Sequence, residues 1–353
     1  MSARRQASRN YGDLVAPLST LFVAAALLAV IPLARGADTA DKLQVATPSG
    51  GSTAILSAIA SQLGYFKAVD LDVAIFDAGG GNNAVSTVVG GDAQIGVVGI
   101  RNASKPVERG QPLKLIATET TVFSQYIVVR PEILAKADTG GWTLVQRGAR
   151  LRDLKIGVND VGGSSGEFAR YALAAAGLGD RAASIINLNS AFARLSALKA
   201  GRIDGLVGSP PEPEIAVAQG YGTILVDPTR DLPELGQLSS NVHIVRADYL
   251  SSHRTVVRRY LQAVDRALRL ARSDPDGAKR AFYDYERHES QGNELDPVIA
   301  DLAWKDIVLS FGDALATSPD QYANAQKFFK IPPSVSYQQF IDNSVIESLA
   351  SGN

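Results

Sequence analysis

The sequence contains no cysteine and only three histidines, and these absences narrow its chemistry. Without thiols the chain forms no disulfide and offers neither a cysteine nucleophile nor thiolate ligands for zinc or iron–sulfur clusters. It also lacks the N-terminal cysteine that carries a lipid anchor. The histidines, His243, His253 and His288, are not spaced as pairs of metal ligands. We therefore expect no metal, no cofactor and no lipid anchor.

Neither sign of charge dominates the sequence. Lys and Arg number 35 and Asp and Glu number 36, which gives a net charge of −1 over 353 residues. A chain without basic excess or long charge runs lacks the electrostatic surface that nucleic acids and anionic membranes attract. Its length suits two domains with cores of their own. We expect a two-domain monomer that does not bind nucleic acid.

The first 36 residues are typical of a secretory signal peptide. Arg4, Arg5 and Arg9 precede an apolar run over residues 14–33, and small residues surround Gly36. The strongly apolar part of this run is short for the roughly 20 residues that a membrane-spanning helix needs. A basic start, an apolar core and a small-residue site predict cleavage near Gly36 and export to the periplasm. Whether Arg4 and Arg5 form a twin-arginine signal stays open.

Two stretches of the chain share one order of apolar strands and amphipathic helices. The first has expected strands at 43–46, 71–76 and 93–98, and the second at 154–158, 185–188 and 205–207. Asp92 and Asp204 precede the third strands and lie 49 and 50 residues after Leu43 and Leu154. Strands that alternate with helices predict βαβ units and a parallel sheet. We therefore predict an α/β fold with two lobes.

Two segments are expected to cross between the lobes, at 117–148 and 238–245. The first contains a strand at 125–130, and helical patterns follow the second at 256–268, 297–309 and 319–329. The resulting division assigns 37–138 and 239–353 to lobe 1 and 139–238 to lobe 2. The C-terminal helices are expected to pack on lobe 1. Parallel sheets bind ligands at the carboxyl ends of their strands, so a cleft is expected where the lobes face each other.

Several segments, in this order and spacing, resemble one protein family. They are Leu63–Lys67, Leu71–Val73, Gly91–Gly96, Leu151–Val158 and Ala197–Asp204, with further matches in the C-terminal helices. The chain resembles the nitrate/sulfonate/taurine-type substrate-binding proteins, whose relatives include binders of the thiamine pyrimidine precursor. The resemblance implies a type II periplasmic-binding fold with a hinge of two crossings. It also implies an import function, with a small-molecule ligand and an ABC permease in the inner membrane as partners.

One turn departs from the pattern of that family. After the strand at 205–207 the chain reads Gly208-Ser209-Pro210-Pro211-Glu212, where sulfonate and nitrate binders commonly place an aromatic or aspartate-containing turn. Helix N-termini with unpaired N–H groups favour an anionic ligand. A sulfonate, a nitrate-like anion or an aromatic or pyrimidine compound would suit the family. Because no arginine clamp is certain, neutral and zwitterionic ligands stay open.

Candidate ligand-binding residues lie in turns where strands end and helices begin. Such turns expose unpaired backbone donors and short polar side chains to a cleft. The candidates are Ser49, Gly50, Ser52, Thr53, Gly80, Gly81, Asn82, Gly99, Ile100, Arg101, Thr121, Gln125, Gly163, Ser164, Ser165, Ser190, Ser209, Pro211 and Glu212.

Several candidates have a structural interpretation beside the functional one. Asn82, Ser164 and Ser190 each suit the N-cap of the helix that follows. Arg101 clamps an anion in one interpretation and is a solvated surface residue in the other. Glu212 either accepts hydrogen bonds from the ligand or stabilises the first turn of its own helix.

Three functions are compatible with these patterns to different degrees. The family resemblance favours a solute-binding subunit of an importer, and a ligand sensor for a signalling partner is the alternative. The segment Gly162-x-Ser164-x-Gly166 matches the nucleophile elbow of serine hydrolases. However, no glycine-rich oxyanion motif with a histidine precedes it. Pyrimidine synthases of the same fold rely on cysteines that this chain lacks. We therefore expect a binding protein and no enzyme.

Overall fold

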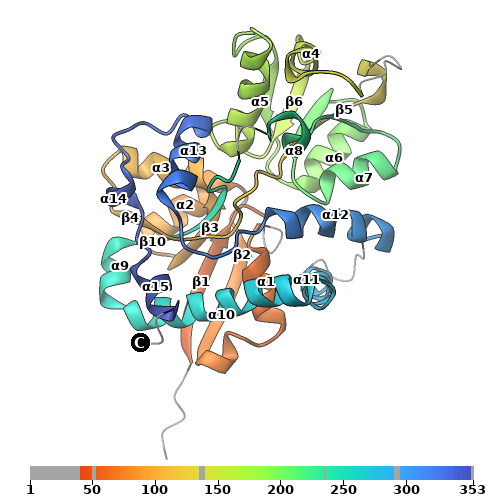
Figure 1. Cartoon of the computed structure of the whole chain (residues 1–353). Helices are drawn as coiled ribbons and strands as arrows, with labels where there is room; N and C mark the ends of the chain where they lie inside the picture. Colours follow the sequence, from red (N-terminus) through yellow and green to blue (C-terminus); the bar gives the residue numbers. More distant parts are fainter. Residues whose placement is uncertain (1–39, 50–52, 135–139, 234–235, 290–294, 351–353) are drawn as a thin grey trace, which may run out of the picture. The chain divides into compact units, whose positions relative to one another are not determined.

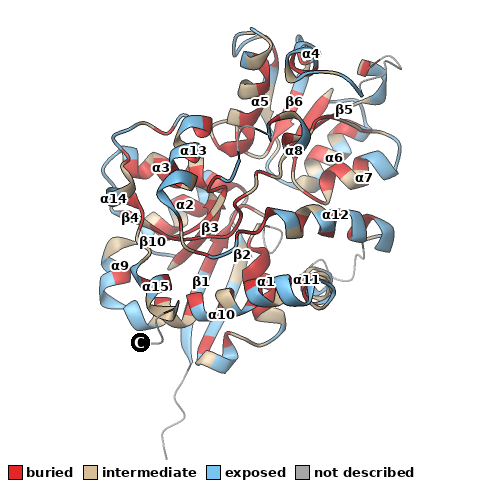
Figure 2. Cartoon of the chain, viewed as in Figure 1, coloured by how far each residue is buried: buried red, intermediate tan, exposed pale blue. Residues whose placement is uncertain are grey.

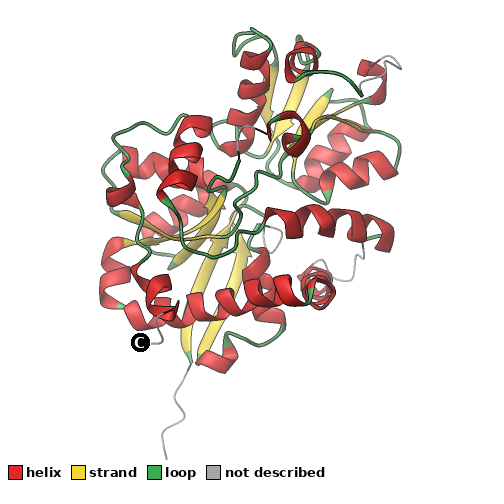
Figure 3. Cartoon of the chain, in the orientation of Figure 1, coloured by secondary structure: helices red, strands yellow, loops and turns green. Residues whose placement is uncertain are grey.

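The structure is a computed structural model that describes residues 40–49, 53–134, 140–233, 236–289 and 295–350 (Figure 1). The predicted signal peptide and the candidates Gly50 and Ser52 lie outside the described residues. Within the described ranges no helix is both long and apolar enough to cross a membrane. Figure 3 shows two groups of strands with helices on their flanks.

The first sheet has five strands in the order β2-β1-β3-β10-β4. Strand β1 runs parallel to β2 and β3, whereas β10 runs antiparallel to β3 and β4. Val45 and Ala46 of β1 are both fully inaccessible, and because consecutive strand residues point to opposite faces, both faces of this sheet are covered. Their bounds are β1 Asp41–Thr47, β2 Leu71–Asp77, β3 Ile95–Gly99, β4 Leu113–Thr118 and β10 Asn241–Arg246.

The second sheet repeats this arrangement with the order β7-β6-β8-β5-β9. Strand β6 runs parallel to β7 and β8, and β5 runs antiparallel to β8 and β9. In each sheet the antiparallel strand, β10 in the first and β5 in the second, follows a crossing from the other lobe. The bounds are β5 Tyr126–Val129, β6 Lys155–Val158, β7 Ser184–Asn187, β8 Gly205–Gly208 and β9 Thr223–Val226.

Helices connect the strands in both lobes in the predicted alternation. In lobe 1 they are α1 Ile55–Gln62, α2 Gly81–Gly90 and α3 Ile100–Glu108, with the 3-10 helix η2 Lys67–Val69. In lobe 2 they are η3 Pro131–Leu134, α4 Leu144–Ala149, α5 Ser164–Ala175, α6 Ala191–Lys199, α7 Glu212–Ala218 and α8 Pro228–Asp231.

The predicted two-lobed α/β fold is confirmed, and two details differ from expectation. Each sheet is mixed instead of fully parallel, because a strand that arrives from the other lobe enters the sheet in the opposite direction. The strand expected at 125–130 is β5, which pairs with β8 and β9 in the second sheet. The chain has therefore crossed before Tyr126, ahead of the predicted boundary at residue 138.

The C-terminal segment is helical, and most of it covers lobe 1. Its amphipathic helix α10 packs on α1, and α11 and α15 contact α10. Two helices also touch lobe 2, since α12 contacts α7 and α13 contacts α5. Asp296 and Ser318 accept backbone hydrogen bonds and cap α12 and α13. The bounds are α9 Ala247–Ser252, α10 Arg254–Ser273, α11 Pro275–Glu289, α12 Pro297–Ser310, α13 Pro319–Phe329, α14 Tyr337–Phe340 and α15 Ser344–Ala350.

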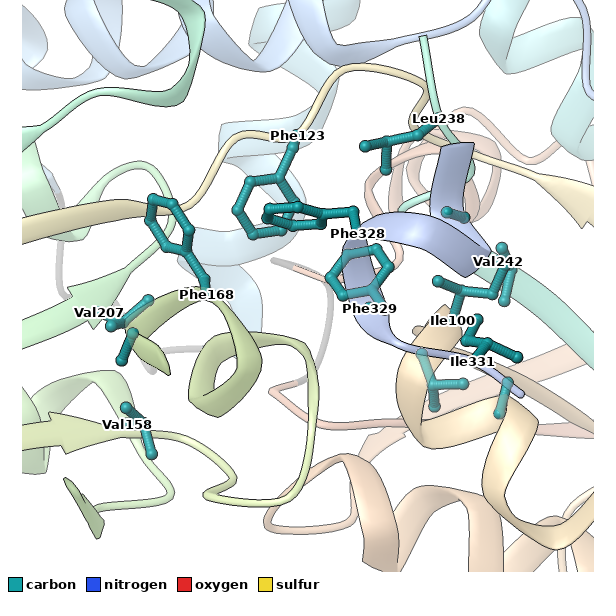
Figure 4. Packing of buried hydrophobic residues seen from close by; sticks show 14 of the residues in the cluster. Ile100, Phe123, Val158, Phe168, Val207, Leu238, Val242, Phe328, Phe329 and Ile331 are labelled. Carbon is teal, nitrogen blue, oxygen red and sulfur yellow. The ribbon is translucent and has the colours of Figure 1, made fainter. Parts of the chain in front are cut away.

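Buried apolar residues follow the strands and the inner sides of the helices (Figure 2). One cluster extends through both lobes and includes aromatic rings where the chain crosses. The ring of Phe123 lies 5.0 Å from that of Phe168 in α5 and 5.1 Å from that of Phe328 in α13 (Figure 4). Edge-to-face pairs of this kind add to the free energy of burial. The crossing segment is thus packed into a shared apolar core.

Candidate functional site

A pocket of about 140 Å³, lined by both polar and apolar residues, lies at the carboxyl ends of the strands, where the two sheets face each other. Lobe 1 contributes Gly99 and Asn102, the crossings contribute Gln125 and Asn241, and lobe 2 contributes a larger set. The lobe 2 residues are Asn159, Ser164, Ser165, Ala191, Arg194, Leu195, Val207, Gly208, Ser209, Pro210, Pro211, Glu212 and Ile215. Ile307 and Ser310 of α12 complete the wall.

About half of the predicted ligand-binding residues line this pocket. Among the described residues these are Ser49, Thr53, Gly99, Gln125, Ser164, Ser165, Ser209, Pro211 and Glu212. They come from both copies of the repeat, as the prediction of a cleft between lobes requires. Their contact with a ligand stays a prediction.

The other candidates lie beside the pocket or away from it. Ile100 is fully buried, and its N–H donates to the carbonyl of Ser240 in the crossing. Arg101 forms an ion pair with Glu108 of its own helix, so its guanidinium is not available as a clamp in the pocket. Thr121 is buried and does not line the pocket, whereas its neighbour Thr120 does. Gly80, Gly81, Asn82, Gly163 and Ser190 also lie outside the lining.

The three predicted N-caps differ in the structure. Ser190 caps α6 as expected, since its Oγ accepts the N–H of Ala193 at 3.1 Å. Ser164 is the first residue inside α5, whose N-cap is Gly163, so its prediction as a cap is wrong. Asn82 is also wrong as a cap, because α2 begins at Gly81 and the Asn82 Oδ1 accepts a bond from Asn102. In both cases a preceding glycine, Gly163 or Gly80, takes the N-cap position, so the polar residue lies inside the helix.

Two polar atoms at the pocket lack hydrogen-bond partners within the described part of the chain. They are the Oγ of Ser164 and the Oε1 of Gln125. Ser164 is 6% exposed, so water does not freely replace the missing partner. An orphaned buried polar group costs free energy, and a ligand that pairs with it removes that cost.

The only ionised residues in the described lining are Arg194 and Glu212, and they bind each other. The Arg194 Nε and Nη2 donate to the two carboxylate oxygens of Glu212 at 2.9 and 2.6 Å. The Nη1 donates to the carbonyls of Leu188 and Asn189 at 2.7 and 3.0 Å. Both side chains are buried, and a buried fork-to-fork pair has fixed geometry. Arg194 thereby ties α6 to α7 behind the pocket.

A second buried carboxylate occupies the N-terminus of α1. Glu119 is fully inaccessible, and its Oε1 accepts the N–H of Leu56 at 3.0 Å. Its Oε2 bonds to the Nε2 of His243 at 3.0 Å, and the Nδ1 of His243 bonds to the hydroxyl of Tyr260 at 3.0 Å. Burial raises the pKa of Tyr260 well above its ordinary value, so the phenol stays protonated. The protein itself thus supplies the anion at this helix end.

Direct hydrogen bonds join the lobes at the mouth of the pocket. The Nδ2 of Asn102 donates to the Oδ2 of Asp160 at 2.7 Å, and the Nδ2 of Asn189 donates to the carbonyl of Gly79 at 2.8 Å. The amide of Asn102 is held between two glycines. A Cβ on Gly81 or on Gly163 would lie 2.7 Å from it. The chain is therefore in a closed arrangement in which Asn102 of lobe 1 inserts into lobe 2.

Ionisable groups near these contacts have shifted pKa values. Burial lowers the pKa of Lys105, an effect that nearby Asp160 opposes. On α7, burial raises the pKa of Glu214 to about 7, and the neighbouring carboxylates Asp306 and Glu212 add to the rise. Asp306 accepts a bond from the hydroxyl of Tyr126 at 2.7 Å. Glu214 thus has a raised pKa on a helix, α7, that contacts α12.

Comparison with known proteins assigns the family. The family model described as "NMT1/THI5 like" matches residues 53–278, and the chain belongs to this family. This confirms the predicted family relationship. A comparison with curated proteins finds no match.

Solved structures share the fold at low sequence identity. A protein from Bordetella bronchiseptica RB50 is 21% identical with a TM-score of 0.74, covering 90% of this chain and 99% of its own. The alkanesulfonate-binding protein SsuA from Xanthomonas axonopodis pv. citri, bound to MOPS, is 17% identical with a TM-score of 0.62, covering 84% and 93%. The periplasmic nitrate-binding protein NrtA from Synechocystis PCC 6803 is 14% identical with a TM-score of 0.65, covering 88% of each chain.

Several residues of the pocket escaped the sequence analysis. Asn102 lies inside a helix and Asn159 follows a strand, positions that did not stand out among the many polar residues of the chain. Arg194 offered a usable signal, since it follows the N-cap Ser190 by four residues and points to the same helix end. Glu119 carries no local signal, because its partners Leu56 and His243 are distant in sequence.

Proposed function

We propose that this protein is the periplasmic solute-binding subunit of an ABC importer. The observation that carries the proposal is a closed polar pocket lined by both lobes and holding unpartnered polar atoms. Solved structures of the same fold bind alkanesulfonate and nitrate. The protein captures a small ligand between its lobes and delivers it to a permease in the inner membrane.

Ligand capture of this kind depends on contacts with both lobes. A ligand shifts an equilibrium between open and closed forms only if it binds the closed form more tightly. Ser164 belongs to lobe 2, whereas Gly99 and Asn102 of the same pocket belong to lobe 1. A molecule seated between them gains its full set of contacts only after closure, and the permease can then distinguish loaded from empty protein.

The geometry around Ser164 favours binding over hydrolysis. A serine nucleophile needs a hydrogen-bonded base, but the Ser164 Oγ has no partner among the described residues. Both ring nitrogens of His243 are engaged with Glu119 and Tyr260. We therefore propose that the protein is not an enzyme.

The proposal can be tested with the exported protein, a small-molecule panel and the permease. A ligand at one hundred times its Kd should stabilise the protein by about 2.7 kcal/mol, and small-angle X-ray scattering should show a more compact particle. The loaded protein should stimulate ATP hydrolysis by the reconstituted transporter. Binding without such stimulation would favour a sensor, and ester turnover that Ser164→Ala abolishes would overturn the proposal in favour of a hydrolase.

A further inference from the structure

The charges in the pocket cancel each other within the protein. Of the described lining residues only Arg194 and Glu212 are ionised, and they form a bidentate pair. The described lining thus has no net charge to offset the charge of a ligand.

Arg194 has almost no capacity left for an anion. A guanidinium has five N–H donors. Four described hydrogen bonds hold Arg194, two to Glu212 and two to backbone carbonyls. Because the carboxylate of Glu212 already occupies the fork, a ligand anion would have to displace it from a buried site.

One of the helix ends that face the pocket is occupied by an acidic side chain, and a second acid lies near the other. The Leu56 N–H of α1 is bonded to the buried carboxylate of Glu119. Near α5, the carboxylate of Asp160 accepts the N–H of Gly162 at 2.9 Å. Lys105, a further basic residue near the pocket, does not line it. Among the acidic residues, Asp160 has the largest effect on the pKa of Lys105.

What the pocket leaves unsatisfied is polar and uncharged. Among the described residues, the hydroxyl of Ser164 has no hydrogen-bond partner and the side-chain carbonyl oxygen of Gln125 has no donor. The first suits a hydrogen-bond acceptor on the ligand, and the second requires a donor. The volume of about 140 Å³ is close to that of an engineered cavity of roughly 150 Å³ that holds benzene.

We propose that the pocket binds a small polar ligand without net charge, which accepts a hydrogen bond from Ser164 and donates one to Gln125. The inference rests on the proposed solute-binding function and names its substrate class. The ion pair of Glu212 with Arg194 causes anions to be rejected, because the only guanidinium in the described lining is already bonded to a carboxylate of the protein.

The test compares molecules of equal shape and different charge. Wild-type protein is equilibrated with equimolar benzamide and benzoate, and with methanesulfonamide and methanesulfonate, and the bound molecules are released and quantified by mass spectrometry. We expect each uncharged member to be recovered at least tenfold over its anion. Equal or greater recovery of the anions would overturn the inference. Recovery of anions would still support solute capture, so the failure of this inference and that of the proposed function are distinguishable.

A substitution at Glu212 tests the role of its ion pair with Arg194. Glu212→Gln should release the charge of Arg194 and strengthen the binding of benzoate and methanesulfonate by at least tenfold in calorimetric titrations. Glu214→Gln is the matched control, since it removes the next acid of α7, which does not line the pocket. Circular dichroism establishes that each variant is folded. A folded Glu212→Gln protein with unchanged anion affinity would contradict the assigned role, and the competition on wild-type protein holds even if this variant does not fold.

Discussion

The N-termini of α1 and α5 hold equivalent places in the two lobes, yet only one of them is open. Each helix follows the first strand of its copy of the repeat and begins at the pocket. At α1 the buried Glu119 already accepts a backbone N–H, whereas at α5 the hydroxyl of Ser164 has no described partner.

The difference shows how one folding unit acquires two roles. A helix N-terminus attracts an anion by default. In lobe 1 a tertiary contact from the end of β4 supplies that anion permanently, which makes α1 part of the scaffold. In lobe 2 the equivalent end is left for a ligand. The predictions below test this division from the largest expected effect to the smallest.

Removal of the scaffold anion should have the largest effect. Glu119→Ala leaves His243 and the Leu56 N–H without their described partner in a fully buried site, so we expect a loss of about 3–5 kcal/mol in the free energy of unfolding. Urea unfolding measures it. Glu132→Ala, which breaks an exposed pair with Arg130, should cost less than about 1 kcal/mol. Similar losses in the two variants would show that Glu119 does not hold α1 in place.

The contact between α7 and α12 has no counterpart in the repeat and should make stability depend on pH. The pKa of Glu214, raised to about 7 in the folded protein, lies above its ordinary value of 4.5, so the folded state binds the proton more tightly. The stability from this group is complete below pH 4.5 and is lost as the pH rises through about 7. The loss is at most roughly 3 kcal/mol and is reduced by solvent screening.

Glu214→Gln should flatten this dependence. Thermal unfolding between pH 4.5 and 8 should show a smaller fall in Tm for the variant than for the wild-type protein. Glu132→Gln, an exposed acid of lobe 2, should leave the profile unchanged. A wild-type Tm that rises over this range in step with the variant would rule out Glu214 as the titrating group.

Obstruction of the closed mouth should weaken ligand binding with little effect on stability. Gly163→Ala places a methyl group 2.7 Å from the amide of Asn102, which Gly81 prevents from moving away. We expect affinity for the ligand found by screening to fall at least tenfold, or about 1.4 kcal/mol. Gly179→Ala is the control, since no atom lies within 4 Å of its added Cβ. Equal affinity in both variants would show that the contact of Asn102 with Gly163 is not needed for closure of the lobes.

The smallest effect on stability is expected at the open helix end. Ser164→Ala removes an unpartnered hydroxyl and should change the free energy of unfolding by less than about 0.5 kcal/mol, while it weakens ligand binding. Ser190→Ala removes a true N-cap and should cost about 1 kcal/mol. Chemical unfolding with ligand titration separates the two serines, and a reversed order would show that Ser164 supports α5.

The elements of the fold were largely predictable, because their signals are local. The strands expected at 71–76 and 205–207 are β2 and β8, and the helices expected at 297–309 and 319–329 are α12 and α13. Periodicity and capping residues depend only on neighbours along the chain. The antiparallel placement of β5 and β10 was not predictable, since a buried apolar strand reads alike in either direction.

The pocket was predictable only in its position. Ser164 lies where the repeat predicts the start of a helix, Gln125 lies at the start of the strand expected in the crossing, and both line the pocket. The pairing of Arg194 with Glu212 was missed, even though the two residues are only 18 positions apart in the sequence. Each of them also suits a solvated position near the end of its own helix. The role of Glu119 depends on partners 63 and 124 positions away.

The sequence by itself determined two α/β lobes, the alternation of their elements and the face on which a ligand can bind, because hydrophobic period and helix boundaries are encoded locally. Only the tertiary structure decided which polar groups bond to one another and which are left without a partner among the described residues. That outcome rests on distances between residues far apart in the chain, and in the described lining it pairs Arg194 with Glu212 and leaves the hydroxyl of Ser164 and the carbonyl oxygen of Gln125 without partners.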